Sequence, residues 1–351
     1  MPPKPSQIAP YVNPFVIGHP AEGSNIADRN SEIDRVTRAF ADPSSRIVVY
    51  GDRRMGKTSV VAAAASAAKS QGTPVAVVDL AKVTSAEAAV QRVLSAVHKE
   101  IGARWRDTAM SLIQRLRPGT VSLSGGLDAT GSPTVTFSVT PVTTAAEGTG
   151  LFTDVLDAVE AELVSRGLSM GIALDEFQRL RFWCGDEIDW PLKAMLERHR
   201  RISYVLAGSE RTLIAQMLDN KKAGLWKLVE ILDVQPIPPG VFAQWLTDRA
   251  ATTGVRFDAA VSEMVVRLPG PRSRDVVHLA RVLWELTHDY GEASTDDVAT
   301  AMDQLVLEQS ALYLREWTQL ESDVERKILL LLADDPRTEL TATSTLRRYQ
   351  L

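Results

Sequence analysis

The segment from Gly51 to Thr58, which reads Gly-Asp-Arg-Arg-Met-Gly-Lys-Thr, constrains the fold of this chain more than any other feature. The run before it, 46–50, is largely apolar and predicts a buried strand, and the Ala-rich run after it predicts a helix over 57–70. A strand, a glycine-bounded loop and a helix N-terminus in this order form a cradle for phosphate groups. Glycine lets the backbone approach phosphate oxygens, and the loop N–H groups and the helix dipole supply positive potential. The sequence therefore predicts that the chain binds a nucleotide.

The residue types of this loop suit the parts of a nucleotide that it would hold. We expect the Lys57 ammonium to reach the β- and γ-phosphates and the Thr58 hydroxyl to ligate Mg²⁺. The other residues predicted to bind the phosphates are Gly51, Asp52, Arg53, Arg54, Met55, Gly56 and Ser59. The histidines and the single cysteine, Cys184, show no spacing typical of metal ligands. The metal that we expect is therefore the magnesium that accompanies the nucleotide.

Composition predicts a soluble, cytoplasmic protein of two or three domains. The 351 residues are 45% hydrophobic and 24% charged, which is ordinary for a globular protein of that size. No apolar run approaches the ~20 residues that span a bilayer, and the N-terminus lacks the apolar core of a secretory signal. One cysteine excludes an internal disulfide and fits a reducing compartment. The net charge of −5 argues against a nucleic-acid coat over the whole molecule.

Apolar runs that alternate with helical patterns predict an α/β core with a parallel sheet. Besides 46–50, we expect buried strands at 74–79, 171–174, 202–206 and 229–234. From residue 241 onward only helical patterns appear. The predicted organisation is an N-terminal arm and nucleotide-binding core over 1–240, a helical lid over 241–311 and a short helical segment over 312–351.

The stretch 117–150 interrupts this alternation. Residues 120–124 and 134–139 alternate apolar and polar side chains on either side of a glycine-containing turn, which predicts a β-hairpin. We interpret the stretch as an insertion that nucleotide binding does not require and that could meet another protein or a second copy of the chain. A helical pattern resumes at Leu151.

Two adjacent carboxylates, Asp175 and Glu176, follow the apolar strand predicted at 171–174. Ligands of open α/β sheets sit at the carboxyl edge of the strands, so an acidic pair there suits a nucleotide site. We expect Asp175 to hold Mg²⁺ through water, and Glu176 to orient or deprotonate an attacking water. Taken alone, the pair could also be a solvated acidic turn. The phosphate loop upstream favours the catalytic interpretation.

Two further positions are candidates for contact with the γ-phosphate. Ser209 ends the strand predicted at 202–206 and could reach the γ-phosphate or the catalytic water, although a simple Gly-Ser turn explains it as well. Arg274 opens a helix in the all-helical region and could fold back onto the phosphates, with Arg272 as the substitute if the helix starts earlier. The alternative is that both arginines form a surface basic pair.

These residues together resemble the archaeal-type ATPase family, on the STAND and replication-initiator side of the AAA+ P-loop ATPases. The phosphate loop and the Leu-Asp-Glu-Phe-Gln segment that ends at Gln178 carry most of the likeness. Three other segments follow the family pattern in order: 26–33, which includes Arg29 near the adenine; 207–209; and 270–274. Asp28 stands where the family usually has glycine.

The resemblance implies an ASCE-type P-loop fold and Mg²⁺-dependent ATP binding with slow hydrolysis. The bound nucleotide, ATP or ADP, would set the state of a conformational or assembly switch. That switch would act on a protein partner or on a second copy of the chain. It also implies the start of a winged helix-turn-helix, with helices over 325–333 and 342–348. Too little sequence follows for a recognition helix and a wing, so we expect DNA binding to be weak. A scaffold that binds nucleotide without hydrolysing it, and a DNA-acting AAA+ factor, are the two alternatives.

Overall fold

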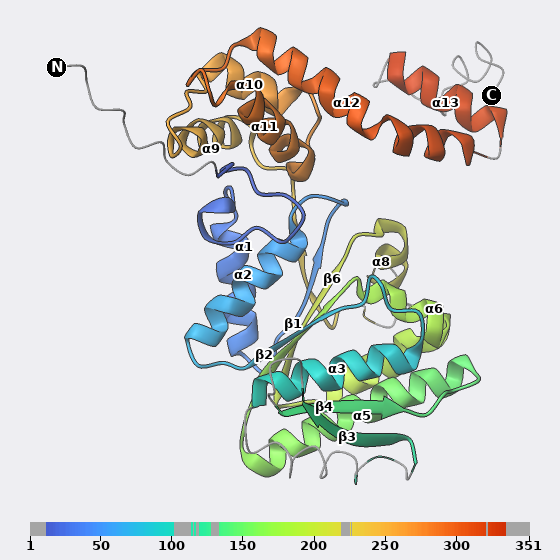
Figure 1. The fold of residues 1–351 in the computed structure, drawn as a ribbon. Coiled ribbons are helices and arrows are strands. Elements are labelled where there is room, and N and C mark those ends of the chain that lie inside the picture. Colours follow the sequence, from blue (N-terminus) through green and yellow to red (C-terminus); the bar gives the residue numbers. More distant parts are fainter. Residues whose placement is uncertain are drawn as a thin grey trace.

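The computed structural model describes residues 12–101, 114, 116, 119–127, 133–218, 225, 227–320 and 322–334. A sheet forms the centre of the molecule, with helices on both faces and a separate group of helices above one edge (Figure 1). No helix among the described residues is long and apolar enough to cross a membrane.

The central sheet has five parallel strands in the order β2-β5-β6-β1-β7. Their bounds are β1 Arg46–Tyr50, β2 Val75–Asp79, β5 Met170–Asp175, β6 Ile202–Gly208 and β7 Glu230–Asp233. All five predicted strands are therefore present. The expectation that each is buried is wrong for β7, because it lies at the edge of the sheet and only its Leu232 is buried. Because β6 lies between β1 and β5, the end of β6 falls between the phosphate loop that follows β1 and the acidic pair that follows β5.

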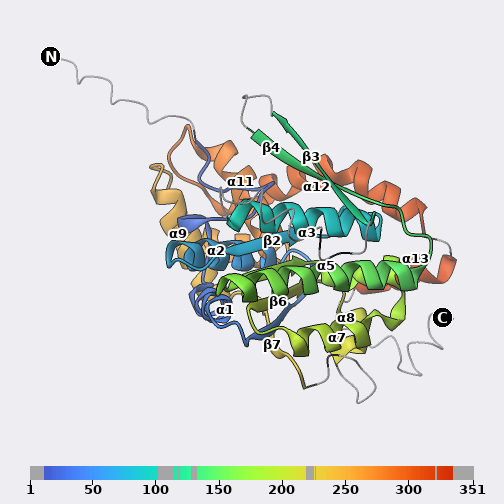
Figure 2. The ribbon, with the colours of Figure 1, turned by 90° about the horizontal axis from the view of Figure 1, so that it is seen from below.

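Alternate side chains of each strand enter different cores, as the period of two in a strand requires. Ile47 and Val49 pack with the pair α1 (Asn30–Ala41) and α2 (Lys57–Ser70) on one face of the sheet. Val48 faces the other core, together with α3 (Ala86–Ile101), α5 (Ala145–Arg166) and α7 (Asp189–Arg198). Figure 2 shows these helices along the sheet from below. Helices thus pack against both faces of the sheet and support the strands whose carboxyl ends form the site.

The predicted hairpin is present as β3 (Val121–Leu127) and β4 (Pro133–Val139), which pair in antiparallel register. The hairpin packs against the rest of the core, because Val121 and Phe137 are buried together with side chains of α3 and α5. The following helix starts earlier than the predicted Leu151. A capping box between Thr144 and Glu147 starts α5 at Ala145, and this Thr-x-x-Glu signal could have been found in the sequence.

The lid consists of α9 (Pro239–Ala251), α10 (Ala259–Arg267), α11 (Ser273–Thr287) and the first half of α12 (Thr295–Thr318) around a core of its own. Because α12 runs on to Thr318, the boundary predicted at 311 falls inside a helix. The next helix, α13 (Asp323–Asp334), contains the predicted 325–333, whereas the predicted helix 342–348 lies outside the described residues.

Short helices not predicted individually complete the core. Between β5 and β7 these are η2 (Phe177–Arg179), α6 (Leu180–Cys184), η3 (Asp186–Ile188) and α8 (Arg211–Leu218), and η1 (Gly23–Asn25) lies in the N-terminal arm. Among them, η2 matters most for the site, because it follows the acidic pair directly.

Candidate nucleotide-binding site

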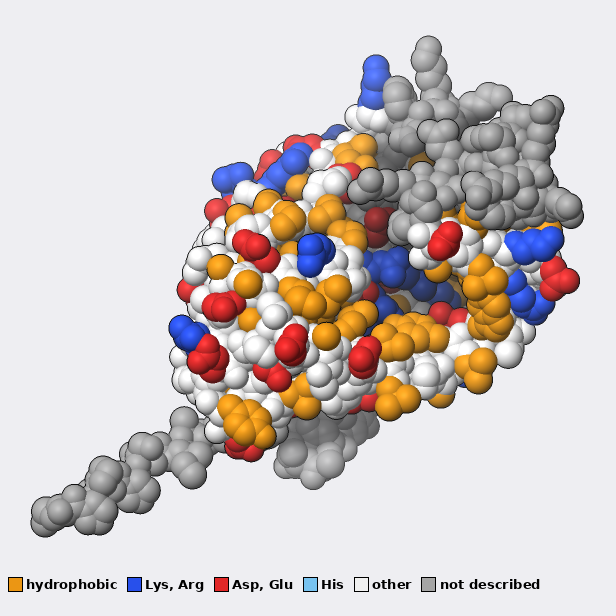
Figure 3. Space-filling view, turned by 90° about the horizontal axis from the view of Figure 1, so that it is seen from above, with side chains coloured by type: hydrophobic (Ala, Val, Ile, Leu, Met, Phe, Trp, Pro, Cys, Tyr) orange, Lys and Arg blue, Asp and Glu red, His pale blue; other side chains and the backbone are white. Residues whose placement is uncertain are grey.

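A cavity of about 1040 Å³ lies where the carboxyl edge of the sheet meets the lid. Its walls come from the N-terminal arm (16–21), the phosphate loop (53–59), the start of α11 and one turn of α12. Viewed from above, the molecule has a hollow with Lys and Arg side chains gathered in it (Figure 3). A cleft in which cations outnumber carboxylates, at this edge of an α/β sheet, suits an anionic ligand.

The phosphate loop needs its two glycines at the positions where they occur. At Gly51, with φ of 151°, a Cβ would stand 2.7 Å from the carbonyl oxygen of Val234. Gly56 precedes α2 with φ of 94°, in the left-handed region that glycine adopts without strain. Arg54 has φ of 69° without being glycine, so the loop holds one residue in a costly conformation.

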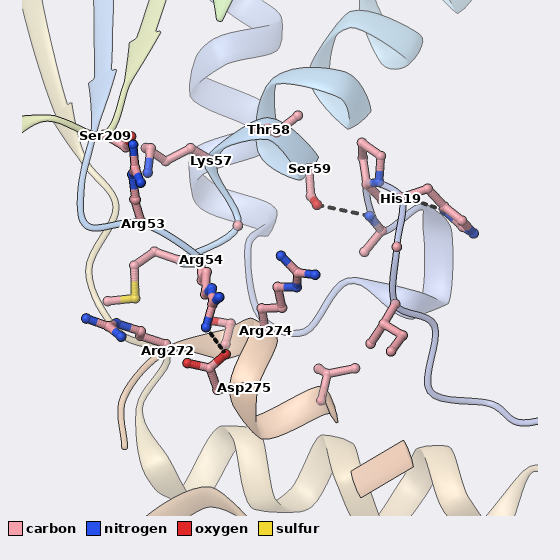
Figure 4. Close-up of a pocket in the computed structure, with 18 of the residues that line it drawn as sticks. His19, Arg53, Arg54, Lys57, Thr58, Ser59, Ser209, Arg272, Arg274 and Asp275 are labelled. Atoms are coloured by element: carbon pink, nitrogen blue, oxygen red, sulfur yellow. Dashed lines mark hydrogen bonds and ion pairs between the residues drawn. The ribbon is translucent and has the colours of Figure 1, made fainter. Parts of the chain in front are cut away.

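Lys57 is buried at the centre of the loop. Its ammonium donates to the carbonyl oxygens of Gly51 (2.9 Å) and Asp52 (2.7 Å). The loop thus curls around the cation and keeps it at the floor of the cavity, with Arg53 and Ser209 on the same side of the close-up (Figure 4). This places positive charge where the sequence predicts the β- and γ-phosphates.

Thr58 and Asp175 meet although 117 residues separate them in the sequence. The Thr58 hydroxyl donates to Asp175 Oδ2 at 2.7 Å, and the backbone N–H of Glu176 donates to Oδ1 at 3.0 Å. Burial raises the pKa of Asp175, and the charges of Glu176 and Asp79 add to that rise against the Thr58 hydrogen bond. A hydroxyl beside a carboxylate that is poorly solvated is a donor set that a hard cation such as Mg²⁺ fits. No group of three or more His, Cys, Asp or Glu suited to a metal occurs among the described residues.

Glu176 belongs to a second cluster one residue further along. Ser209 Oγ lies 3.0 Å from both carboxylate oxygens of Glu176, and Gln178 Nε2 donates to Oε2 at 2.5 Å. Glu176 has φ of 56°, which turns the chain sharply after β5. Its carboxylate is therefore fixed by two donors from different elements.

Gln178 contacts the Glu176 carboxylate, and no role of its own was predicted for it from the sequence. It is fully buried, and it packs so closely on β6 that a Cβ at Gly208 would stand 2.4 Å from its Oε1. In the sequence, the only indication of a role for Gln178 was its place in the Phe-Gln pair that follows the two acidic residues.

Arg29 lines the cavity, and its guanidinium also contacts the protein itself. It pairs with Glu32 (2.8 Å) and donates to the carbonyl oxygens of Met55 (3.2 Å) and Gln235 (2.8 Å). Arg29 thereby ties the phosphate loop to the chain leaving β7. Its predicted place near the adenine stays a prediction. Asp28, in the usual place of glycine, has a left-handed φ of 38°.

The lid touches the phosphate loop directly. The backbone N–H of Arg274 donates to the carbonyl oxygen of Arg54 at 3.1 Å, and the Arg54 guanidinium pairs with Asp275 at 3.0 Å (Figure 4). The side chains of Arg272 and Arg274 are exposed and line the cavity. Sequence reasoning placed Arg274 here but missed Asp275, because its partner Arg54 is 221 residues away.

The N-terminal arm also joins lid and core. Phe15 is buried in the lid, stacked on Phe257, and the backbone N–H of Ala21 donates to Ser59 Oγ at 2.9 Å. The Ser59 hydroxyl, predicted to face the phosphates, therefore contacts the arm. Arg249 of α9 donates to the Pro14 carbonyl oxygen at 3.0 Å. The arm thus forms one side of the cavity.

Comparisons with known proteins support the fold. No protein-family model matches the sequence, and a search among curated proteins finds no match. Solved structures match well: a Walker-type ATPase of Pyrococcus abyssi has 16% identity and a TM-score of 0.59, over 90% of this chain and 81% of that one. The ORC2 protein of Aeropyrum pernix, solved in ADPNP and ADP complexes, has 18% identity and a TM-score of 0.55 over 96% and 82%.

A third match is the ORC1 protein of Aeropyrum pernix, solved in complex with DNA, with 17% identity and a TM-score of 0.53 over 93% of this chain and 78% of that one. The chain therefore has the fold of the AAA+ P-loop ATPases, as the sequence predicts. Identities this low establish the fold alone.

Proposed function

We propose that this protein binds ATP with Mg²⁺, hydrolyses it slowly, and uses the nucleotide to change the position of its lid or its assembly state. One observation carries the proposal: Lys57, the Thr58–Asp175 pair and the Glu176–Ser209 pair meet at one edge of the sheet. All of these residues except the buried Asp175 line one cavity. A phosphate cradle, a magnesium donor set and a candidate general base in this order are what hydrolysis of a nucleoside triphosphate needs. The complexes of the ORC2 protein with ADPNP and ADP support the choice of nucleotide.

Each residue then has a defined task. Lys57 compensates the charge of the β- and γ-phosphates, and Thr58 and Asp175 hold the Mg²⁺, which neutralises phosphate charge when it is bound. Glu176 accepts the proton of the attacking water. Ser209 and Gln178 donate to the Glu176 carboxylate and orient it, and the lone pairs that they leave free can accept from the water.

The lid contacts support the switch. Arg54 belongs to the phosphate loop and also contacts Asp275 in the lid, so a bound phosphate and the lid carboxylate compete for one guanidinium. A ligand shifts a conformational equilibrium only if its contacts differ between the two states. Contacts that the nucleotide makes to Arg54 and Arg274 differ when the lid moves.

Turnover measured on purified protein tests the proposal. We expect Mg²⁺-dependent ADP release by the wild type and its loss in Glu176→Gln. Equal, near-zero turnover in both proteins, with MgATP still bound, would support the non-hydrolysing scaffold instead. Failure to bind MgATP in calorimetry would overturn nucleotide binding altogether.

A DNA-acting role is the second candidate, and the structure of the ORC1 protein with DNA favours testing it. With a net charge of −5, we propose only weak, non-specific DNA binding, in the range ~10⁻⁴–10⁻⁶ M at physiological salt. Hydrolysis stimulated by duplex DNA, or nanomolar sequence-selective binding in an anisotropy titration, would make this the leading function.

A further inference from the structure

Arg179 lies on the turn directly after the acidic pair. Its backbone N–H donates to the carbonyl oxygen of Glu176 at 3.0 Å, and it ends the short helix η2. The two residues before it, Phe177 and Gln178, are fully buried, so the turn is anchored on the core. Arg179 lines the same cavity as Glu176 and Ser209. Its side chain thus starts from a rigid support on the β5 side of the cavity.

In the described part of the chain, Arg179 has no acidic partner, whereas two other arginines of this region do. Arg54 pairs with Asp275, and Arg181, two residues along, pairs with Asp189 at 2.5 Å. Among the described residues, the Arg179 guanidinium forms no ion pair or hydrogen bond, and its Nε is buried without a partner.

The contact that the Arg179 guanidinium does make is with an aromatic ring. Its Cζ lies 5.2 Å from the centre of the Phe182 ring. Stacking on a ring leaves the N–H groups in the guanidinium plane free to donate. A buried N–H without an acceptor is unfavourable, so an anion entering the cavity gains both the charge and the hydrogen bonds.

The position of Arg179 determines which part of a bound nucleotide it can contact. Lys57 occupies the loop side of the cavity, where the sequence predicts the β- and γ-phosphates. Arg179 comes from the side of Glu176 and Ser209, where water would attack. We propose that Arg179 contacts the γ-phosphate and stabilises its charge during hydrolysis, as an arginine finger supplied by the same chain. This inference rests on the proposed ATP hydrolysis.

Hydrolysis of ATP at this site needs no reactant other than water. The water oxygen forms a bond to the γ-phosphorus, the bond from that phosphorus to the oxygen bridging it to the β-phosphate breaks, and one water proton passes to Glu176. Arg179 exchanges no proton. It donates to γ-phosphate oxygens, on which the charge of the transition state is spread.

The test compares Arg179→Ala and Arg179→Lys with wild type, and uses Arg200→Ala as control, because Arg200 is exposed beyond the C-terminal end of α7 and does not line the cavity. Calorimetry with Mg²⁺ measures affinity for AMP-PNP and for ADP, and single-turnover hydrolysis of ATP measures the chemical step. For Arg179→Ala we expect a loss of about tenfold or more for AMP-PNP, ADP affinity within about twofold of wild type, and a rate lower by on the order of 10³-fold.

Two further readouts separate contact with the phosphate from a structural role. Added guanidinium at millimolar concentration should partly restore hydrolysis by Arg179→Ala and leave Arg200→Ala unchanged. Arg179→Lys should retain part of the preference for AMP-PNP because it keeps the charge. The wild-type rate should not depend on protein concentration, since Arg179 and Lys57 line one cavity of one chain.

The outcomes are distinct. An unchanged ratio of AMP-PNP to ADP affinity in Arg179→Ala, or equal losses of both nucleotides with a lower melting temperature, would overturn the role of Arg179 while the proposed function stands. Absence of nucleotide binding in the wild type would remove the proposed function, and the role of Arg179 with it.

Discussion

The two walls of the cavity differ in how completely their polar side chains are engaged. On the sheet wall, Lys57, Thr58, Glu176 and Ser209 form hydrogen bonds with other groups of that wall. Arg179 is the exception, because its Nε has no partner among the described residues. On the lid wall, the Arg272 and Arg274 side chains are exposed and form no hydrogen bond or ion pair with the described residues. Most of the sheet wall is therefore held by hydrogen bonds of its own, and our proposal expects a bound anion to orient the two lid arginines.

The two walls differ because the strand ends and the lid are held in place by different contacts. Strand ends are fixed by ladder hydrogen bonds and by cores on both faces of the sheet. The lid has a separate core, and in the described part of the chain it contacts the phosphate loop through Arg54, by a backbone hydrogen bond and a partly exposed ion pair. Partly exposed pairs contribute about 0–1 kcal/mol. Because the contact between lid and phosphate loop is this weak, a ligand that bridges the two can change it, while the N-terminal arm keeps the lid attached to the core.

The largest effect should come from Lys57→Ala, which removes the central cation of the sheet wall. Affinity for MgATP should fall by at least ~100-fold, because a buried charge-assisted contact to phosphate is lost. Calorimetry measures this, with Lys69→Ala on the same helix as control, since Lys69 pairs with Glu100 away from the cavity. Unchanged binding in Lys57→Ala would show that the phosphate loop is misassigned.

Glu176→Gln should separate binding from chemistry on the same wall. We expect MgATP affinity close to wild type and turnover lower by ~100-fold or more, because the amide cannot accept the proton of water. The exposed Glu187→Gln is the matched control. If turnover matches the wild type, Glu176 is not the base, and the nucleotide has a structural role.

Arg274→Ala addresses the lid wall, where smaller effects are expected. ADP affinity should stay within about twofold, and compaction on adding ATP should be reduced, because only the γ-phosphate would draw this guanidinium inward. Small-angle scattering with ATP and with ADP measures the compaction, with Arg267→Ala on α10 as control. Identical ATP-induced shifts in wild type and Arg274→Ala would exclude this role and leave Arg272 as the candidate.

The smallest expected effect is that of Asp175→Asn on the stability of the ligand-free fold, and this substitution should stabilise it. Burial raises the pKa of Asp175, so the ionised carboxylate lowers the stability of the ligand-free fold at neutral pH. The variant should melt slightly higher than wild type near pH 7, and its Mg²⁺-dependent nucleotide binding should weaken.

The pH dependence of that difference follows from the direction of the shift. Below the ordinary carboxyl pKa, wild-type Asp175 is protonated in both folded and unfolded chains, and the advantage of the variant disappears. As pH rises to the raised pKa of the folded protein, the unfolded chain releases its proton first, and wild type loses stability relative to the variant. Thermal melts across acidic to neutral pH measure this. A lower melting temperature for Asp175→Asn at pH 7 would contradict it.

Much of the fold and the main site could be predicted because their signals are local. The phosphate loop and the helix after it occupy consecutive residues, and every core strand except β7 is a largely apolar run. Hydrophobic periodicity reports burial directly, so α2 and β1 were predicted at their observed bounds. The start of α5 at Ala145 was missed although its capping box is also local.

The remaining features depend on residues far apart in the chain. The sequence by itself determined the glycine-bounded loop, Lys57 and the acidic pair, because each is a short pattern whose chemistry follows from neighbouring residues. Tertiary structure alone decided that Ser209 and Gln178 hold Glu176 and that Arg54 meets Asp275. It also decided that Arg179 lines the cavity with no acidic partner among the residues that the structure describes. The order of strands and the placement of the lid decide these contacts, and they follow from packing of the whole chain, which no local pattern encodes.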